Sequence, residues 1–470
     1  MPLILGTNSI KDTGYDVANS CRFNDGSSDH LSRSISSTGN RRTYTISTWF
    51  KRGSMGANQK VITAGTAGQE AGLQFYDGST ENTLRFYEYT GSNNIVIAPN
   101  RLLRDPSAWY HVVIGVDTTQ STESNRVKYY LNGVQETSFA TATYPSQNYD
   151  TKFNTSGSTN YIGFLGSHSA YFDGYMAETV LVDGQQLDAT SFGEFDEDSG
   201  IWKPIDVSGL TFGTNGFYLD YEDSSALGND AAGSNNFTVN NLTSIDQTTD
   251  TCTNNYSTWN PIDGKTSSST FSEGNLKTVS ANSPNICGTS TFGLSQGKWY
   301  YEIKLTTEAV AGEAFMGVGG DMETNTDSDP RNEIPYYAIR NQSGIIQTGV
   351  SQSSSQHPNF SAGDIIGFGL DLDNNRLYIS KNGSWWDSTT TFSGSTPTNY
   401  ISLGTGFSHW RVMVANVGGA SAQETYEANF GNPPFSISSG NSDADGYGNF
   451  EYSVPSGYYA LNTKNLAEYG

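Results

Sequence analysis

Acidic side chains are the first residues to examine, because hydrolysis of a glycosidic bond needs two carboxyl groups facing one cleft, roughly 5–9.5 Å apart. On a β-strand such a pair has to occupy positions i and i+2 or i+4, since adjacent side chains point to opposite faces. The nearest run is Glu194-Phe-Asp-Glu-Asp198, in a polar stretch between Gly193 and Gly200. We interpret this run as a solvated acidic turn, and the sequence predicts a protein that is not an enzyme.

Aromatic side chains in loops and near strand ends are better candidates, and the chemistry they offer is binding. Aromatic faces combined with Asn, Asp and Gly hydrogen bonds hold sugars, and binding hot spots favour Trp, Tyr and Arg. Trp385 and Trp386 follow an Asn-Gly turn, so we expect one side chain in the core and the other exposed. The other candidates are Tyr336, Tyr337, His409 and Trp410 in the second half of the chain, and Tyr171 and Phe172, beside His168, in the first.

The composition limits the classes of partner. The chain has 470 residues, which at about 100–200 residues per domain suggests two to four domains. It carries 25 Lys and Arg against 48 Asp and Glu, a net charge of −23, whereas binding to phosphates needs clustered basic residues. The N-terminal apolar run is too short for a signal peptide, and no stretch has the length of a membrane span. We therefore expect no nucleic-acid partner, no membrane insertion and synthesis in the cytoplasm.

The elements that must position these side chains are short strands. Ser, Thr, Asn and Gly disfavour helices, whereas Tyr, Phe, Trp, Thr and Val fit strands. Residues 43–50 alternate, with Tyr44, Ile46, Thr48 and Phe50 on one face, and residues 297–305 alternate in the same way. Residues 109–116 form a nearly continuous apolar run, typical of a strand buried on both faces, which predicts a structural role for His111. The sequence thus predicts an all-β protein.

Two stretches resemble known domain families. Residues 18–195 resemble the laminin-G/concanavalin A-like lectin superfamily, a two-sheet jelly roll. The matching motifs are Cys21-Arg-Phe-Asn-Asp-Gly26, Thr45-Ile-Ser-Thr-Trp-Phe-Lys-Arg52, Trp109-Tyr-His-Val-Val113, Tyr130-Leu-Asn-Gly133 and Gly174-Tyr-Met-Ala-Glu-Thr-Val-Leu-Val-Asp-Gly184. Residues 258–433 resemble the SPRY (B30.2) domain, through Gly297-Lys-Trp-Tyr-Tyr-Glu-Ile-Lys-Leu305, Met316-Gly-Val-Gly319 and the run from Gly363 to Trp386.

These resemblances imply two concanavalin-like β-sandwich (jelly-roll) domains in tandem. The predicted boundaries are an N-terminal arm (1–17), a laminin-G/concanavalin A-like jelly roll (18–200), an extended connector (201–257), a SPRY-like β-sandwich (258–435) and a C-terminal tail (436–470). Laminin-G-like domains often hold one calcium ion through loop carboxylates, which suits a hard cation. That resemblance makes calcium the one candidate cofactor, with Asp77, Asp173 and Asp183, acids at strand ends near glycine, as possible ligands.

The order of these segments over nearly the whole chain resembles tail-fibre or virion structural proteins of bacteriophages. The resemblance implies a virion component assembled in the host cytoplasm, in contact with other virion proteins and with a host surface glycan or receptor. We expect a homo-oligomer, as fibres commonly are. Six basic residues and no acid lie between Leu31 and Lys60, so Arg41, Arg42 and Arg52 are predicted to dock on another virion subunit.

The function that the sequence favours is a non-enzymatic tail-fibre or tail-associated adhesin. One alternative is a capsid-decorating or structural subunit that makes only protein–protein contacts. A polysaccharide depolymerase is the alternative from another class.

Overall fold

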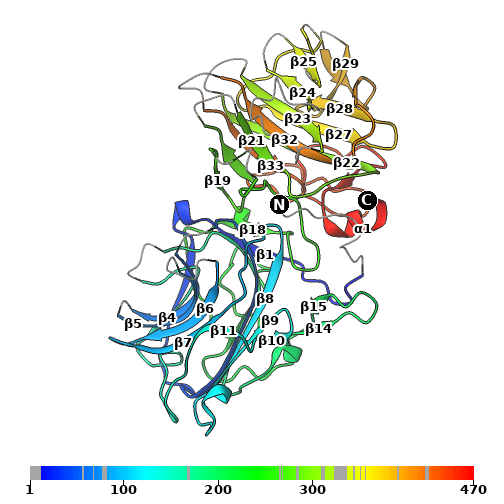
Figure 1. Ribbon diagram of the computed structural model, residues 1–470. Coiled ribbons are helices and arrows are strands. Elements are labelled where there is room, and N and C mark those ends of the chain that lie inside the picture. The colour runs from blue at the N-terminus through cyan, green and yellow to red at the C-terminus, as the bar shows by residue number, and fades with distance from the viewer. Residues whose placement is uncertain are drawn as a thin grey trace. The chain divides into compact units, whose positions relative to one another are not determined.

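The computed structural model of the protein is nearly all β-structure and divides into two compact units, shown in Figure 1. The first unit comprises Thr13–Asn254, and the second comprises Asn255–Gly470 together with Asp12. The structure describes residues 12–470 except 56–57, 67, 77–81, 167–169, 264–265, 267, 282–284, 309–312, 322–335, 342–343, 350, 355, 389–390 and 419–422. Within this described part, none of the helices has the length and apolarity needed to cross a bilayer.

The first unit is a sandwich of two antiparallel sheets. One sheet has the order β10 (Val134–Gln135), β9 (Val127–Leu131), β8 (Trp109–Asp117), β3 (Thr43–Arg52), β13 (Gly174–Asp183), β1 (Ser20–Phe23) and β18 (Gln247–Thr248), with β16 (Phe217–Leu219) also paired to β13. The other has the order β11 (Phe139–Thr143), β7 (Asn93–Pro99), β6 (Leu84–Tyr89), β5 (Gln69–Phe75), β4 (Gln59–Thr66), β12 (Thr159–Ile162), β2 (His30–Ser34) and β17 (Thr238–Asn240). A hairpin of β14 (Gly193–Phe195) and β15 (Trp202–Pro204) and the short 3-10 helices η2 (Asp25–Ser27), η3 (Glu123–Asn125), η4 (Ala189–Ser191) and η5 (Ser244–Asp246) complete it.

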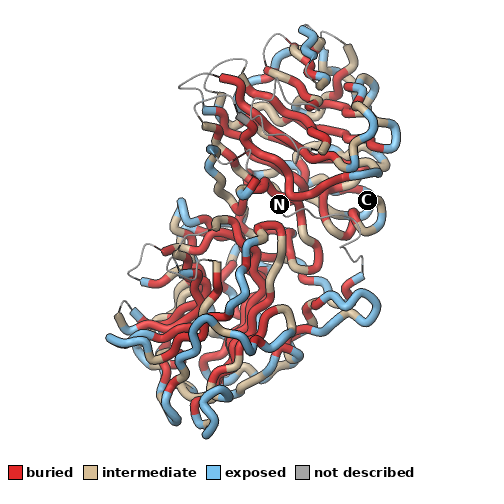
Figure 2. Tube along the Cα trace, in the orientation of Figure 1, coloured by how far each residue is buried: buried red, intermediate tan, exposed pale blue. Residues whose placement is uncertain are grey.

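The central strands β3 and β13 are buried along almost their whole length, and the tube in Figure 2 is red along the central strands of this unit. Tyr44, Ile46 and Phe50 of β3 point into the core between the sheets, as the alternation predicts. Trp49 points the other way, into a second apolar cluster that includes Phe192, Trp202 and Tyr218. The segment predicted as an extended connector, 201–257, supplies much of this cover and contributes β15 to β18, pairing with strands of the first unit.

His111 of β8 has the structural role that its apolar strand predicts. Its ring lies between the indoles of Trp49 and Trp202, with ring centroids 4.6 Å and 6.0 Å away. Trp202 Nε1 donates to His111 Nδ1 at 3.0 Å, so the other ring nitrogen, Nε2, carries the proton and faces Ser47 Oγ at 2.8 Å. Burial lowers the pKa of His111 to about 3, which keeps the imidazole neutral.

The second unit is also a two-sheet sandwich. Its larger sheet has the order β19 (Thr270–Ser272), β20 (Lys277–Val279), β33 (Thr425–Asn429), β22 (Lys298–Thr307), β27 (Ile365–Asp371), β28 (Arg376–Lys381), β29 (Ser384–Ser388) and β30 (Thr391–Gly394), with β31 (Tyr400–Ser402) on β28 and β34 (Tyr459–Ala460) on β22. The other has the order β21 (Asn285–Thr289), β32 (Trp410–Asn416), β23 (Ala314–Gly320), β24 (Tyr336–Arg340), β25 (Ile345–Thr348) and β26 (Ser351–Ser353). The helix α1 (Thr463–Tyr469) follows β34 (Figure 1).

The larger sheet of the second unit has apolar side chains on both faces. Trp299, Tyr301, Ile303 and Leu305 of β22 point into the core between the sheets, as the alternation predicts. The opposite face, here called the outer face, carries Tyr300, Tyr378 and Trp385. The C-terminal segment covers this face, because Phe450 and Tyr458 pack on the same cluster and β34 pairs with β22. The predicted C-terminal tail is therefore an integral layer of the second unit.

Candidate functional site

The candidate site is a pocket of about 840 Å³ between the outer face and the C-terminal segment. We call it the outer-face pocket. The sheet contributes side chains from β22, β27, β28 and β29, and the C-terminal segment contributes residues 452–456 and Tyr458. Pockets of roughly 300–1,000 Å³ with mostly apolar walls and a few placed polar groups are the usual form of small-ligand sites.

Strand alternation and one glycine position the aromatic wall of the pocket. In β28, Leu377 and Ile379 enter the core, so Arg376 and Tyr378 face outward. In β29, Trp386 enters the core and Trp385 faces outward. Gly369 on the neighbouring strand leaves room for two rings, because a Cβ there would lie 3.2 Å from Tyr458 and 3.5 Å from Trp385. Tyr378, Trp385 and Tyr458 thus form one aromatic wall.

The Asn382-Gly383 turn between β28 and β29 sets the position of Tyr452, which forms another side of the pocket. Asn382 and Gly383 both have positive φ, at 48° and 81°, the conformation that two-residue hairpin turns require. A Cβ on Gly383 would lie 2.5 Å from the Tyr452 ring. The tyrosine ring therefore packs directly on the turn.

We predict that Gly383→Ala lowers the free energy of unfolding by about 1–3 kcal/mol and displaces Tyr452 from the pocket. Urea denaturation of the full chain measures the first effect. Gly363→Ala is the matched control: Gly363 also has a positive φ, 95°, but a Cβ there meets nothing within 4 Å. If the two variants lowered the free energy of unfolding equally, the result would contradict the packing of Tyr452 on Gly383.

The polar groups of the pocket fall into two sets. In the first, Asp371 is already satisfied, because its oxygens accept from the backbone N–H and the side-chain amide of Asn374 at 2.9–3.1 Å. In the second are the hydroxyl groups of Ser395, Thr396, Ser453 and Ser456, all exposed at the rim. Within the described residues these hydroxyls make no hydrogen bond to the protein, so they are available to a ligand.

Glu302 anchors the C-terminal segment to the outer face. Its Oε1 accepts from Tyr300 Oη at 3.0 Å and from the backbone N–H of Tyr452 at 2.8 Å. Its Oε2 accepts from Asn429 Nδ2 and from the backbone N–H of Glu451, both at 3.0 Å. Burial raises the pKa of Glu302 to about 7, while the four donors act to lower it. This carboxyl group therefore holds the wall of the pocket in place.

The structure corrects several of the predicted aromatic binding residues. Trp386 and Trp410 lie in the core of the second unit, Tyr336 in a buried cluster beside Phe315, and Phe172 in the core of the first unit. These four side chains are at most 8% exposed. Trp385 is also buried, at 5%, because the C-terminal segment covers it, but it lines the outer-face pocket.

Three predicted aromatic residues are half-buried and lie outside this pocket. Tyr337 packs edge-on against Trp410, with ring centroids 5.4 Å apart. His409 lies 3.4 Å from Asp321 in a turn. Tyr171 stacks on Phe164 at 4.5 Å. His168 lies outside the described residues. The structure therefore does not bring the predicted residues together into one site.

The predicted calcium ligands do not form a site among the described residues. Asp173 precedes the ten-residue strand β13 and Asp183 ends it, so about 30 Å separates them at the usual rise per residue. Asp183 is occupied by hydrogen bonds from Asn40 N, Asn154 Nδ2 and Asn215 N, at 2.7–3.1 Å. Asp77 lies outside the described residues, and the rest of the described chain has no group of three His, Cys, Asp or Glu side chains suited to a metal.

One residue of the predicted basic docking surface, Arg52, is internal. Arg52 is fully buried, where its guanidinium donates to Asn82 Oδ1 and Leu103 O and lies 3.9 Å from the Phe75 ring centroid. Lys51 forms a buried ion pair with Asp250 at 2.8 Å. These residues end a strand covered on both faces, so the prediction for Arg52 is wrong.

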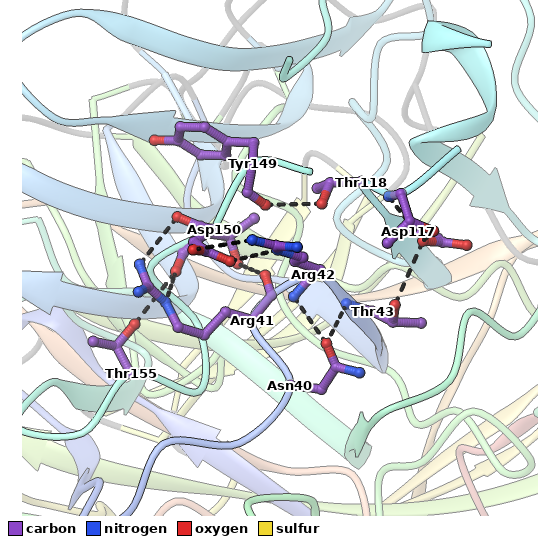
Figure 3. A network of polar contacts seen from close by, with 11 residues as sticks. Asn40, Arg41, Arg42, Thr43, Asp117, Thr118, Tyr149, Asp150 and Thr155 are labelled. Atoms are coloured by element: carbon purple, nitrogen blue, oxygen red, sulfur yellow. Dashed lines mark hydrogen bonds and ion pairs between the residues drawn. The ribbon is translucent and has the colours of Figure 1, made fainter. Parts of the chain in front are cut away.

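Arg41 and Arg42 remain at the surface but face their own unit, as Figure 3 shows. Arg42 Nε lies 2.7 Å from Asp150 Oδ1. Arg41 donates to the backbone carbonyls of Thr151 and Asp150, at 2.8 Å and 3.0 Å. Both guanidinium groups thus hold the segment at 150–151 against the turn that precedes β3.

The acidic run at 194–198 is a surface turn. Asp196 accepts from the backbone N–H and hydroxyl of Ser199, and those hydrogen bonds lower its pKa to about 2. Lys203 lies 3.3 Å from Asp196 and 3.5 Å from Glu194. A general acid needs a raised pKa, so Asp196 does not have the electrostatics of a general acid.

Arg376, Tyr378 and Tyr458 are site residues that the sequence analysis missed. The sequence did contain a signal for Arg376 and Tyr378. They alternate with Leu377 and Ile379, so if those two side chains face the core, Arg376 and Tyr378 lie on the opposite face of the strand. Nothing local to Tyr458 indicates that the segment around it returns to β22, 160 residues earlier in the chain, where Tyr459 pairs with Trp299.

Comparison with protein families confirms both domain types. Residues 25–188 match the concanavalin A-like lectin/glucanases superfamily (Laminin_G_3), and residues 298–413 match the SPRY domain. No curated protein matches the chain. The chain therefore contains a concanavalin A-like domain followed by a SPRY domain.

Solved structures with similar folds have low sequence identity. A putative carbohydrate binding protein from Bacteroides ovatus is 17% identical, over 48% of this chain and 59% of that one, with a TM-score of 0.33. The SPRY domain of human HERC1 is 15% identical, over 33% of this chain and 87% of that one, with a TM-score of 0.26. The LG1-3 region of the laminin alpha2 chain is 9% identical, over 88% of this chain and 62% of that one, with a TM-score of 0.33.

Proposed function

We propose that this chain is a non-catalytic binding protein that holds glycan in the outer-face pocket of its second unit. The observation that carries the proposal is the set of groups that line the pocket: an aromatic wall of Tyr378, Trp385 and Tyr458, and four rim hydroxyls that make no hydrogen bond within the described residues. Aromatic faces bind the apolar faces of sugar rings, and hydroxyl groups exchange hydrogen bonds with sugar hydroxyls.

The acids of the pocket support binding without hydrolysis. Asp371 is the one carboxylate among the described residues that line it, and its oxygens are occupied by Asn374. Hydrolysis by either common route requires a second carboxyl group across the scissile bond. The concanavalin A-like and SPRY domains are binding folds, which is consistent with this proposal.

A glycan array probed with the full chain tests the proposal. Ser456→Trp places a bulky side chain at the exposed rim of the pocket and should weaken binding at least about 10-fold, a loss of roughly 1.4 kcal/mol. Ser353→Trp, at an exposed position on β26, is the matched control and should bind like the wild type. Unchanged binding by Ser456→Trp would contradict the site. Oligosaccharides released from a bound polymer would favour a depolymerase instead.

We further propose a setting for this activity: a bacteriophage virion, in which the chain is a homo-oligomeric tail-fibre or tail-associated adhesin that contacts the host surface. The order of the sequence segments supports this setting. A capsid-decorating subunit is the alternative within it. Electron microscopy of intact particles with the labelled chain tests the assignment, because a label on the tail supports the adhesin and a label on the capsid shell supports the decorating role.

A further inference from the structure

A second, smaller hollow continues the outer-face pocket. Its volume is about 400 Å³, and its lining includes Lys298, Asp373, Tyr459 and Tyr469. Lys298 lines both hollows, and Gly457 and Tyr459 continue the chain segment that walls the larger one. The two hollows therefore adjoin at Lys298 along residues 452–459, and together they are here called the groove. Such a groove suits a chain of several linked units.

Of the two basic groups of this groove, Lys298 is ion-paired and Arg376 is open to a ligand. Arg376 donates to Tyr378 Oη at 3.2 Å, and its guanidinium lies 4.4 Å from the Tyr400 ring centroid. No carboxylate in the described part of the chain lies within ion-pair distance of Arg376. The ammonium group of Lys298 lies 3.5 Å from Asp371, and its side chain is 36% exposed. A planar guanidinium held by two tyrosines has donors left for a carboxylate.

The acidic groups of the groove are engaged within the protein. The Asn374 amide and backbone occupy Asp371, and Asp373 accepts from the backbone N–H of Gly297 at 2.9 Å. The two basic and two acidic side chains of the groove balance one another, which is a local exception in a chain with a net charge of −23, and Arg376 is the cation among them without a carboxylate partner in the described residues. An anionic ligand is the partner that this arrangement recognises.

We propose that the ligand is an acidic oligosaccharide. This inference rests on the proposed glycan-binding function of the pocket. One uronate carboxylate pairs with Arg376 in the larger hollow, and the sugar chain passes Lys298 to reach Tyr459 in the smaller one. The rim hydroxyls and the aromatic wall distinguish a sugar from an acidic peptide, because they match the hydroxyls and apolar ring faces that a sugar presents.

Isothermal titration of the full chain with three probes tests the inference: tetragalacturonate, its methyl ester and tetraglutamate. Tetragalacturonate should bind about 10–100-fold more tightly than the ester, the usual contribution of a charge-assisted hydrogen bond. Arg376→Gln should abolish this preference by lowering the affinity for tetragalacturonate to the affinity for the ester. Lys381→Gln, on the same strand but outside the groove lining, should retain the preference.

The outcomes separate this inference from the proposed function. Equal affinity for acid and ester, or a preference that survives in Arg376→Gln, would overturn the acidic-ligand inference. If the ester still binds and Ser456→Trp blocks it, the glycan-binding function stands. If no saccharide probe binds, nor any glycan on the array, both proposals fail. Binding of tetraglutamate as tight as that of tetragalacturonate would replace the sugar with an acidic peptide.

Discussion

Glu302→Ala should lower the free energy of unfolding of the second unit by about 3–5 kcal/mol and abolish glycan binding. The substitution removes the acceptor of four hydrogen bonds at a fully buried position. Two of the donors are backbone N–H groups of Glu451 and Tyr452, so the C-terminal segment loses its attachment beside the pocket. Urea denaturation measures the stability, and hydrogen exchange of residues 450–458 measures the release of the segment.

Two further variants make this prediction specific. Glu302→Gln keeps one acceptor oxygen but turns an NH₂ group toward the donors. We therefore expect its free energy of unfolding to lie between that of wild type and that of Glu302→Ala. Glu197→Ala removes an acid from an exposed position in the first unit and should leave both readouts unchanged. Wild-type exchange rates at 450–458 in Glu302→Ala would contradict the role of Glu302 as the anchor of the segment.

Glu178 should make the first unit less stable as the pH rises. Its carboxyl group accepts from Tyr218 Oη at 2.8 Å and 3.0 Å and lies at a bulge in β13, where its φ is +49°. Burial, with the nearby charges of Asp220 and Glu222, raises its pKa to about 8 from an ordinary value near 4.5. Between these two values the folded state keeps a proton that the unfolded chain has lost, so about 4–5 kcal/mol of stability disappears as the pH rises through this range.

The measurement is the free energy of unfolding of wild type and Glu178→Gln between pH 4.5 and 8.5. His111 acts in the opposite direction, because its lowered pKa adds stability as the pH rises from about 3 to its ordinary value near 6.5. Subtracting the free energy of unfolding of wild type from that of the variant isolates the contribution of Glu178. This difference should increase by about 4–5 kcal/mol as the pH rises across the range. Glu194→Gln, at an exposed position, should follow the wild type. Parallel profiles for wild type and Glu178→Gln would show that Glu178 does not titrate in this window.

The sequence predicts the strands well because their alternation records which face meets the core. Tyr44, Ile46 and Phe50 in the first unit and Trp299, Tyr301 and Ile303 in the second all point inward as predicted. What alternation does not show is whether another segment covers the opposite face. In both units such a segment does, and it comes from far along the chain.

This cover explains why the predicted site residues were only partly right. Lys51 and Arg52 look like surface charges at a strand end, but Lys51 pairs with Asp250, 199 residues away in the chain. Trp385 does face away from the core, yet residues that follow it by about 70 positions cover it and make it part of a pocket wall. Local patterns give the direction of a side chain, and only the tertiary structure gives what it meets.

The most direct test of the central claim is a crystal structure of the full chain with the glycan selected on the array. The account predicts sugar density in the outer-face pocket, with a ring against Tyr378 or Trp385 and hydroxyls within hydrogen-bond distance of Ser453 or Ser456. Density confined to the first unit, with the outer-face pocket empty, would contradict it.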